Sequence, residues 1–360
     1  MKNTLTTNDW FTSLKKDGPF LIAGPCSAET PEQVLAIAHQ IKDVASIFRA
    51  GIWKPRTRPG GFEGVGAIGL DWLKKVKEET LLPVGIEIAT AEHVDLALQN
   101  EIDVLWIGAR TSVNPFAVQE IANALKGTDK IVMLKNPVNP DMALWIGGLE
   151  RLLAADIKKV ALIHRGFSTY EKTKYRNVPE WQIPLDVKQH FPNVPMINDP
   201  SHITGNRDMI YDTAQMALNL NFDGLMIETH ITPDRPWSDA AQQVTPLMLI
   251  EILSQLKIRD LSNFEESFQI SIHNHRNAID ELDSKILKLL NKRMQIVEEI
   301  GELKKLKNVA VFQSSRWQEV LDKMKKEALD LELGEQFIID LYKAIHQESI
   351  LRQGKIINKK

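Results

Sequence analysis

The chain of 360 residues has a single cysteine, no apolar run of membrane-spanning length and a formal net charge of only −3. One cysteine excludes an intramolecular disulfide framework, and a bilayer span needs about 20 consecutive apolar residues. The small net charge excludes nucleic-acid binding through overall charge. Residues 1–18 also lack the apolar core of a secretory signal. We therefore expect a cytoplasmic protein with neither a membrane nor a nucleic-acid partner.

Proline is missing after residue 246, and only three glycines follow residue 269. Residues 1–257 alternate short apolar runs with helix-compatible stretches, whereas residues 269–360 carry apolar residues at a helical period. We predict a first domain over 1–257, a linker over 258–268 and an all-α three-helix domain over 269–360.

Eight apolar runs divide the first domain, and each is nearly continuous, as is typical of strands buried on both faces. The runs cover residues 20–27, 46–51, 83–89, 104–109, 130–136, 159–166, 194–202 and 224–230. Eight β-then-α units predict an α/β domain of the (β/α)₈ TIM-barrel type. A doubly wound sheet is the alternative, but the even spacing favours closure into a barrel.

Six cations lie at or just after the C-terminal ends of the predicted strands, where barrels carry their active sites. They are Arg49, Lys54, Arg56, Arg110, Lys135 and Arg165. Cations that converge repel one another unless an anion neutralises them, and arginine binds phosphate and carboxylate bidentately. The pattern predicts a multiply anionic substrate with more than one phosphate. Separate surface cations are the alternative interpretation.

A second set at the strand ends combines a thiol, an imidazole and two carboxylates: Cys26, His202, Glu228 and Asp239. Such mixed donors suit a first-row divalent metal. A lone cysteine in an apolar strand is more often simply buried, and spacing alone is weak evidence. The first, seventh and eighth strands are nevertheless neighbours in a closed barrel, which favours the metal site.

The segment Gly64–Gly69 matches the pattern GxGxxG. A dinucleotide fingerprint requires a strand immediately before the glycines, whereas here the loop KPRTRPGGFE precedes them. We interpret the segment as a flexible loop on the phosphate side and not as a dinucleotide site.

The strand-end motifs GPCS, FRAG with KPRT, GIEIAT, IGART, LKN, HRG, DPSH and IETH occur in order over essentially the whole barrel. In them the chain resembles type I 3-deoxy-D-arabino-heptulosonate 7-phosphate synthase, of the short subgroup. The resemblance implies condensation of phosphoenolpyruvate with erythrose 4-phosphate and release of phosphate.

The resemblance also implies roles for the strand-end residues. Phosphoenolpyruvate would be held by Arg49, Arg110, Lys135 and Arg165, and erythrose 4-phosphate by Lys54, Arg56 and Thr57. One divalent metal, Mn²⁺ before Fe²⁺, Co²⁺ or Zn²⁺, would be bound by Cys26, His202, Glu228 and Asp239. Glu87 and Lys135 are candidates for handling the proton of the attacking water.

A sister family makes 3-deoxy-D-manno-octulosonate 8-phosphate and is the alternative for the barrel, with a non-catalytic regulatory or dimerisation domain behind it. That family is identified by the motif KANRT at the position where this chain has Lys54, Pro55, Arg56 and Thr57. The Pro-Arg pair favours the four-carbon sugar.

The helical domain resembles the all-helical class of chorismate mutase over about 269–353. The matching positions are Arg276, Arg293, Lys304, Arg316, Ser349 and Gln353. The family then implies rearrangement of chorismate to prephenate by Arg and Lys donors, with no nucleophile or metal. The chain departs from the pattern at Trp317, where the family has a Glu that binds the ring hydroxyl, and at Gln313, where it has an Asp.

Arg276 and Arg293 are 17 residues apart, which rotates them by about 100° around one helix. They cannot easily serve one site from one straight helix, so we expect an intertwined dimer in which one protomer lends Arg276 to the other. Two further hypotheses remain for this domain: a regulatory module that senses prephenate or chorismate, and an inert oligomerisation tail.

Overall fold

The computed structural model describes residues 9–54, 60–259 and 265–358. The chain divides into two compact units, Met1–Asp260 and Leu261–Lys360. Among the described residues, no helix combines the length and the apolarity that crossing a membrane requires.

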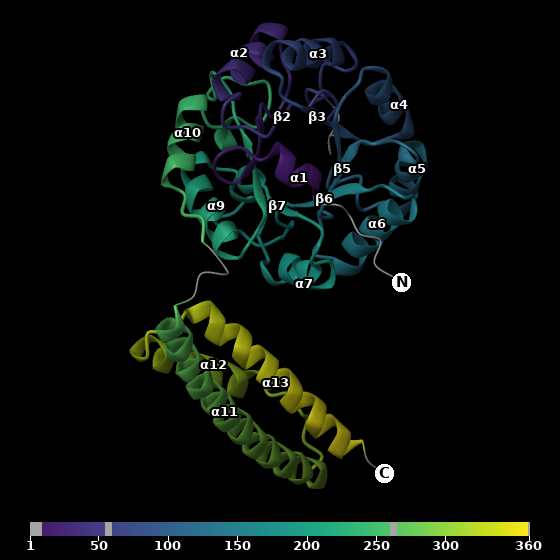
Figure 1. Cartoon of the computed structure of the whole chain (residues 1–360). Helices are drawn as coiled ribbons and strands as arrows, with labels where there is room; N and C mark the ends of the chain where they lie inside the picture. Colours follow the sequence, from purple (N-terminus) through teal and green to yellow (C-terminus); the bar gives the residue numbers. More distant parts are fainter. Residues whose placement is uncertain (1–8, 55–59, 260–264, 359–360) are drawn as a thin grey trace. The chain divides into compact units, whose positions relative to one another are not determined.

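The first unit is a closed barrel of eight parallel strands in sequential order, with β1 paired to β8 (Figure 1). The strands are β1 (Phe20–Gly24), β2 (Ile47–Arg49), β3 (Val84–Ile88), β4 (Val104–Ile107), β5 (Ile131–Lys135), β6 (Lys159–His164), β7 (Met196–Asn198) and β8 (Gly224–Glu228). Every strand falls inside a predicted apolar run, and the predicted TIM barrel is confirmed.

Helices surround the barrel as an outer ring. They are α2 (Pro31–Ile41), α3 (Ile68–Thr80), α4 (Ala91–Gln99), α5 (Pro115–Leu125), α6 (Met142–Ala154), α7 (Gln182–His190), α9 (Ile210–Asn219) and α10 (Pro246–Gln255). The short helices α8 (Pro200–Thr204) and η1 (Arg207–Met209) follow β7, and η2 (Ala240–Gln242) follows β8. Local sequence sets where several begin. Thr30, Asn114 and Thr245 cap α2, α5 and α10 with side-chain oxygens, and a proline follows each at the first helical position.

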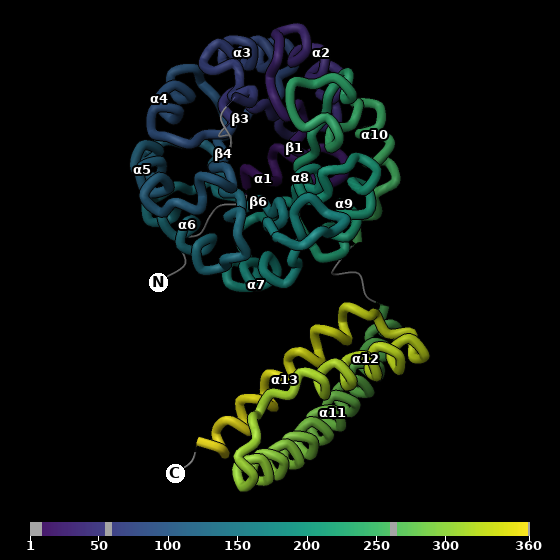
Figure 2. Tube along the Cα trace, turned by 180° about the vertical axis from the view of Figure 1, so that it is seen from behind, coloured from purple at the N-terminus to yellow at the C-terminus, as the bar shows by residue number. Residues whose placement is uncertain are grey.

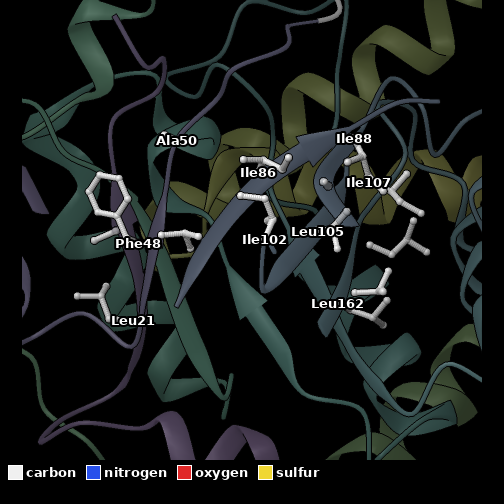
Figure 3. Close-up of a cluster of buried hydrophobic side chains, with 14 of the residues drawn as sticks. Leu21, Phe48, Ala50, Ile86, Ile88, Ile102, Leu105, Ile107 and Leu162 are labelled. Atoms are coloured by element: carbon white, nitrogen blue, oxygen red, sulfur yellow. The ribbon is translucent and has the colours of Figure 1, made fainter. Parts of the chain in front are cut away.

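Alternate strand residues enter two separate apolar layers, as the two-residue period of a strand requires. Phe48, Ile86 and Leu105 point outward and pack between the strands and the helical ring (Figure 3). Ile22, Ile47 and Met133 point inward and fill the barrel. The interior is therefore a packed core, and reactive groups are left to the strand ends.

A short helix, α1 (Asp9–Leu14), closes the N-terminal end of the barrel. In both views, which show opposite sides of the molecule, α1 lies over the middle of the strand ring (Figures 1 and 2). Trp10 joins the inward-facing layer, and Phe11 stacks on Phe20 at the start of β1 with ring centroids 4.0 Å apart. The opposite, C-terminal end is the open end.

The second unit contains α11 (Glu266–Leu306), α12 (Ser314–Asp330) and α13 (Glu335–Ile357). The C-terminal half of α11 packs against α13 through Met294, Val297 and Gly301. Its N-terminal half is different, because within residues 265–289 only Ile272 is even partly buried. The three helices confirm the predicted helical fold.

Candidate active sites

The C-terminal end of the barrel gathers charged side chains that are almost completely buried. Five of them are at most 7% exposed: Arg49, Lys135, Arg165, Asp199 and Glu228. Buried charges are costly unless they are paired, so the partners of each group define the site.

Cys26, just beyond β1, lies between a cation and a carboxylate. Lys54 Nζ is 2.8 Å from its sulfur, and the sulfur is 3.3 Å from Asp239 Oδ2. Burial, with the nearby Glu228, raises the pKa of the Cys26 thiol to about 12. The thiol is therefore protonated at neutral pH and donates to Asp239.

Glu228, at the end of β8, faces the imidazole of His202 and the guanidinium of Arg49. Its Oε1 lies 3.7 Å from His202 Nε2 and 3.2 Å from Arg49 Nη2, yet it accepts no hydrogen bond from the described residues. Burial alone would raise the pKa of Glu228, but His202 and Arg49 outweigh burial and lower it. The carboxylate is thus charged, buried and still able to accept a ligand.

Asp199 is a functional residue that the sequence argument missed. It precedes α8 and accepts hydrogen bonds from Lys135 Nζ at 2.9 Å and from His202 Nδ1 at 3.0 Å. Burial opposes its ionisation, but His202 and Lys135 hold the pKa of Asp199 well below its ordinary value. The position in DPSH, three residues before a histidine at a helix start, was the available signal.

Asp199 determines how His202 presents its ring. Because Nδ1–H donates to Asp199, the other nitrogen, Nε2, is left bare and directed at Glu228. A carboxylate that fixes the tautomer of a histidine in this way commonly supports a metal ligand.

The four predicted metal-binding side chains come together as two pairs: Cys26 with Asp239, and His202 with Glu228. Within the described residues no three His, Cys, Asp or Glu side chains form a group that could hold a metal ion. Lys54, Arg49 and Arg176 pair with these donors. The donor set nevertheless fits a divalent ion: it supplies thiol, imidazole and carboxylate, and one buried carboxylate oxygen lacks a hydrogen bond.

Arg176 and Asn177, in the loop after β6, were also missed. Arg176 Nη1 donates to Asp239 Oδ1 at 2.8 Å and to Gln242 Oε1 at 2.6 Å, and Gln242 Nε2 in turn donates to Glu228. Burial would raise the pKa of Asp239, but Arg176 reverses this and lowers it. One arginine therefore holds the predicted ligands of the β8 side, and no spacing in the sequence indicated it.

Asn177 connects the same loop to both other parts of the site. Its Nδ2 donates to the backbone oxygen of His202 at 2.6 Å, and its Oδ1 accepts from Arg165 Nη1 at 2.6 Å. Burial, together with Arg176 and Arg110 and against the attraction of Asp199, lowers the pKa of Arg165 to about 10. Arg110 and Arg176 therefore lie close enough to Arg165 to disfavour its charge.

Trp106, on β4, has an indole ring that faces two of the buried cations. Arg49 lies over its ring at 5.0 Å and Lys135 at 6.0 Å. Its Nε1 donates to Glu87 Oε2 at 3.1 Å. Gly108 leaves room for Glu87, because a Cβ at that position would lie 2.1 Å from Glu87 Oε1.

The predicted substrate residues are distributed around this centre. Arg110 is exposed in the turn after β4 and adds positive charge near Arg165. Arg56 and Thr57 lie outside the described residues. The glycine segment after them runs into α3, and a Cβ on Gly64 would lie 2.1 Å from the Ile52 backbone oxygen. Gly64 thus serves close backbone packing.

The helical unit contains a pocket of about 380 Å³ between α11, α12 and α13. Its polar lining includes Arg293, Lys304, Gln313, Arg316, His346, Ser349 and Gln353. Arg293 Nη1 donates to Ser349 Oγ at 2.8 Å, and Lys304 Nζ donates to the Val311 backbone oxygen at 2.6 Å. Five of the six predicted mutase residues therefore meet in one pocket.

Arg276 is the sixth, and it is not part of that pocket. It is exposed on the N-terminal half of α11, beside Phe268, Gln269, Ile272 and His273. The 17 residues that separate it from Arg293 correspond to about 25 Å along a helix. Arg276 cannot reach the pocket of its own protomer along a continuous α11.

Comparison with known proteins assigns both units. Residues 12–262 match the DAHP synthetase I family, and residues 275–354 match chorismate mutase type II. The chain is 28% identical over 238 residues to the phospho-2-dehydro-3-deoxyheptonate aldolase of Thermotoga maritima, across 66% of this chain and 68% of that relative. It is also 28% identical over 261 residues to the 2-dehydro-3-deoxyphosphooctonate aldolase of Desulfatibacillum aliphaticivorans, across 66% and 90%.

A crystal structure of the Thermotoga maritima enzyme superposes with a TM-score of 0.59 and 26% identity, over 66% of this chain and 68% of that one. The two matched families carry the activities of 3-deoxy-7-phosphoheptulonate synthase and chorismate mutase. The chain therefore belongs to the DAHP synthetase I family and joins to it a chorismate mutase domain, as a bifunctional enzyme of the shikimate pathway.

Proposed function

We propose that the barrel condenses phosphoenolpyruvate with erythrose 4-phosphate in a metal-dependent reaction, and that the domains run over 1–257 and 269–360. The observation that carries the proposal is the pairing of His202 with Asp199, which leaves Nε2 bare opposite the charged, buried Glu228. A divalent ion, Mn²⁺ in our proposal, would be held by these two residues with Cys26 and Asp239. When bound, the ion supplies Lewis-acid polarisation of the aldehyde oxygen.

The cations of the mouth bind and orient the two phosphates. Arg49, Lys135 and Arg165 are the most buried of these cations, so they hold phosphoenolpyruvate, with the exposed Arg110 beside them. Lys54 holds erythrose 4-phosphate with Arg56 and Thr57. Fixed positive charges in a site of low dielectric stabilise the crowded anions more than water does. Two reactants are thereby kept close enough for the new carbon–carbon bond to form.

We assign to Glu87 and Lys135 the proton of the water that adds after the carbon–carbon bond has formed. Trp106 lies between them: its Nε1 donates to Glu87, and its ring faces Lys135. Glu87 accepts the proton as a general base, and Lys135, held by Asp199, remains a donor to the departing phosphate.

We also propose that the helical pocket is the mutase site. Chorismate carries two carboxylates, and Arg293, Lys304 and Arg316 supply cations for them. The rearrangement is unimolecular, so the pocket acts by holding the compact conformer and by stabilising charge at the breaking ether bond. Gln353 lies at the α11 end of the pocket and donates to the ether oxygen.

The missing Arg276 leads us to propose a homodimer formed through α11. The N-terminal half of this helix exposes Ile279, Leu282, Ile286 and Leu289, each more than half accessible. They follow the three- and four-residue spacing of a helix–helix contact. A second copy would cover this stripe and place its Arg276 at the pocket of the first.

Feedback control is the last part of the proposal. Prephenate is a dicarboxylate like chorismate and would bind the same cations, so we propose that it inhibits the barrel through the fused domain. Equal synthase activity with and without saturating prephenate would contradict this.

The decisive experiment is a two-reaction assay on the full chain. We expect phosphate release from phosphoenolpyruvate with erythrose 4-phosphate, much less with arabinose 5-phosphate, and a separate loss of chorismate. Lys135→Met should remove only the first reaction and Arg293→Ala only the second, so each variant is the control for the other. Preference for arabinose 5-phosphate, or loss of both reactions in either variant, would contradict the assignment.

A further inference from the structure

The proposed mutase pocket has to supply a hydrogen-bond acceptor for each donor of its substrate. Besides its two carboxylates, chorismate carries one ring hydroxyl, which lies across the ring from the ring carboxylate. A hydroxyl that loses water on binding needs an acceptor, because an unmade hydrogen bond in a buried site is costly. The inference below rests on the proposed mutase site.

Acceptors are scarce among the polar groups that line this pocket. Arg293, Lys304 and Arg316 can only donate. Ser349 Oγ already accepts from Arg293 and donates to the Ile345 backbone oxygen. Among the other side chains that line the pocket, the acceptors are two amide oxygens, of Gln313 and Gln353, and the imidazole of His346.

His346 is held firmly while its ring nitrogens remain available. Its ring stacks on Trp317 with centroids 4.1 Å apart and planes 20° from parallel, and Phe312 packs on it edge-on at 5.9 Å. These aromatic contacts fix the plane of the ring but use no nitrogen. The imidazole is therefore held in one orientation in the pocket, and its nitrogens can still form a hydrogen bond.

Its position along α13 separates it from the catalytic amide. His346 lies seven residues before Gln353, which corresponds to about 10 Å along the helix. Gln353 is next to Gly301 of α11, where a Cβ would lie 3.3 Å from the Gln353 Cα. His346 instead faces Trp317 of α12, so the two acceptors occupy different ends of the pocket.

We propose that His346 accepts the hydrogen bond of the substrate's ring hydroxyl and so determines the specificity of the mutase site for a hydroxylated ring. Trp317 positions His346 by stacking and has no acceptor of its own. Burial and the nearby Arg293 lower the pKa of His346, which keeps the ring neutral and one nitrogen free to accept.

The test compares two substrates in the full-length protein: chorismate, and an analogue in which hydrogen replaces the ring hydroxyl. His346→Phe retains the aromatic stack but removes the acceptor. We expect its kcat/KM to fall about tenfold or more with chorismate and to stay within about twofold of wild type with the analogue. His346→Gln, which restores an acceptor, should recover part of the loss with chorismate only.

Phe312→Leu is the matched control, because it loosens the same ring without removing a polar atom. It should change kcat/KM for both substrates by the same factor. An equal loss on both substrates in His346→Phe would overturn the proposal, as would a substrate-dependent loss confined to Gln353→Leu. A wild-type protein without mutase activity would overturn the proposed mutase function and this inference with it.

Discussion

Lys54 Nζ lies 2.8 Å from Cys26 Sγ, so a proposed substrate-binding cation and a proposed metal ligand are in direct contact. The thiol beside it has a pKa of about 12 and keeps its proton at neutral pH. Metal ions bind the thiolate, and a bound ion would separate the lysine from the sulfur. Lys54 would then be available to the phosphate of the proposed second substrate.

Replacement of Cys26 by alanine tests the metal site directly. Loss of a ligand should weaken metal binding by more than the roughly 10- to 100-fold that removal of a supporting residue costs. Calorimetric titration of the chelator-treated protein with Mn²⁺ measures this without reference to turnover. Synthase activity should disappear while chorismate mutase activity stays constant, and a Cys26→Ala protein with full, EDTA-insensitive synthase turnover would contradict the site.

Asp199→Asn should weaken metal binding about 10- to 100-fold, because the amide cannot hold His202 in its present tautomer. It should also raise the KM for phosphoenolpyruvate, since Lys135 loses its buried partner. The matched control is Asp129→Asn, which breaks the exposed pair with Lys159 at the closed end of the barrel. Both properties should be unchanged in the control; equal losses in the two variants would refute the role of Asp199.

His164 gives the barrel a stability that depends on pH. Its Nε2 donates to the Pro179 backbone oxygen, and burial lowers its pKa from 6.5 to about 4. The unfolded chain therefore binds a proton below pH 6.5 that the folded chain takes up only near pH 4. Stability is complete above pH 6.5 and is lost as pH falls towards 4.

The loss between pH 7 and pH 5 should amount to about 2 kcal/mol. Tryptophan fluorescence during urea unfolding measures it, because seven of the eight tryptophans lie before residue 258. His164→Gln should be less stable at pH 7 but lose less on acidification. The same pH slope in both proteins would show that His164 is not the responsible group.

Subunit complementation tests the shared mutase site. Arg276→Ala and Arg293→Ala should each lack mutase activity. In a mixed dimer one pocket regains both arginines, so after co-expression about a quarter of wild-type mutase activity should return, given that half of randomly paired dimers are mixed. Synthase activity is the internal control. Activity in Arg276→Ala alone, or no recovery in the mixture, would contradict the intertwined dimer.

The barrel was predictable because its strands are short, apolar and evenly spaced, so that period and order alone indicate the fold. Cys26, His202 and Glu228 were predictable for the related reason that strand ends converge in any closed barrel. The family pattern named five residues that line one pocket, and the phase of Arg276 against Arg293 indicated that Arg276 would not join them in one protomer.

Other residues were out of reach of that reasoning. Asp199 appeared as a helix cap, and Trp106 as one more apolar strand residue. Arg176 and Asn177 belong to a loop whose path depends on contacts with α8 and η2, which no local pattern encodes. The stack of Trp317 on His346 joins two helices across 29 residues. In the sequence, Trp317 is only a position where the family's carboxylate is missing. The three-dimensional packing shows that its ring supports His346 instead.

The closure of the barrel by α1 affects the order in which ligands bind and leave. Because Trp10 and the packed interior close one end, the proposed substrates and products must enter and leave at the C-terminal end. The substrate that binds deepest must arrive first, and the most buried cations are Arg49, Lys135 and Arg165, which we assign to phosphoenolpyruvate. We therefore expect ordered binding, in which phosphoenolpyruvate enters before the sugar phosphate. The bound sugar phosphate would then cover phosphoenolpyruvate at the open end of the barrel.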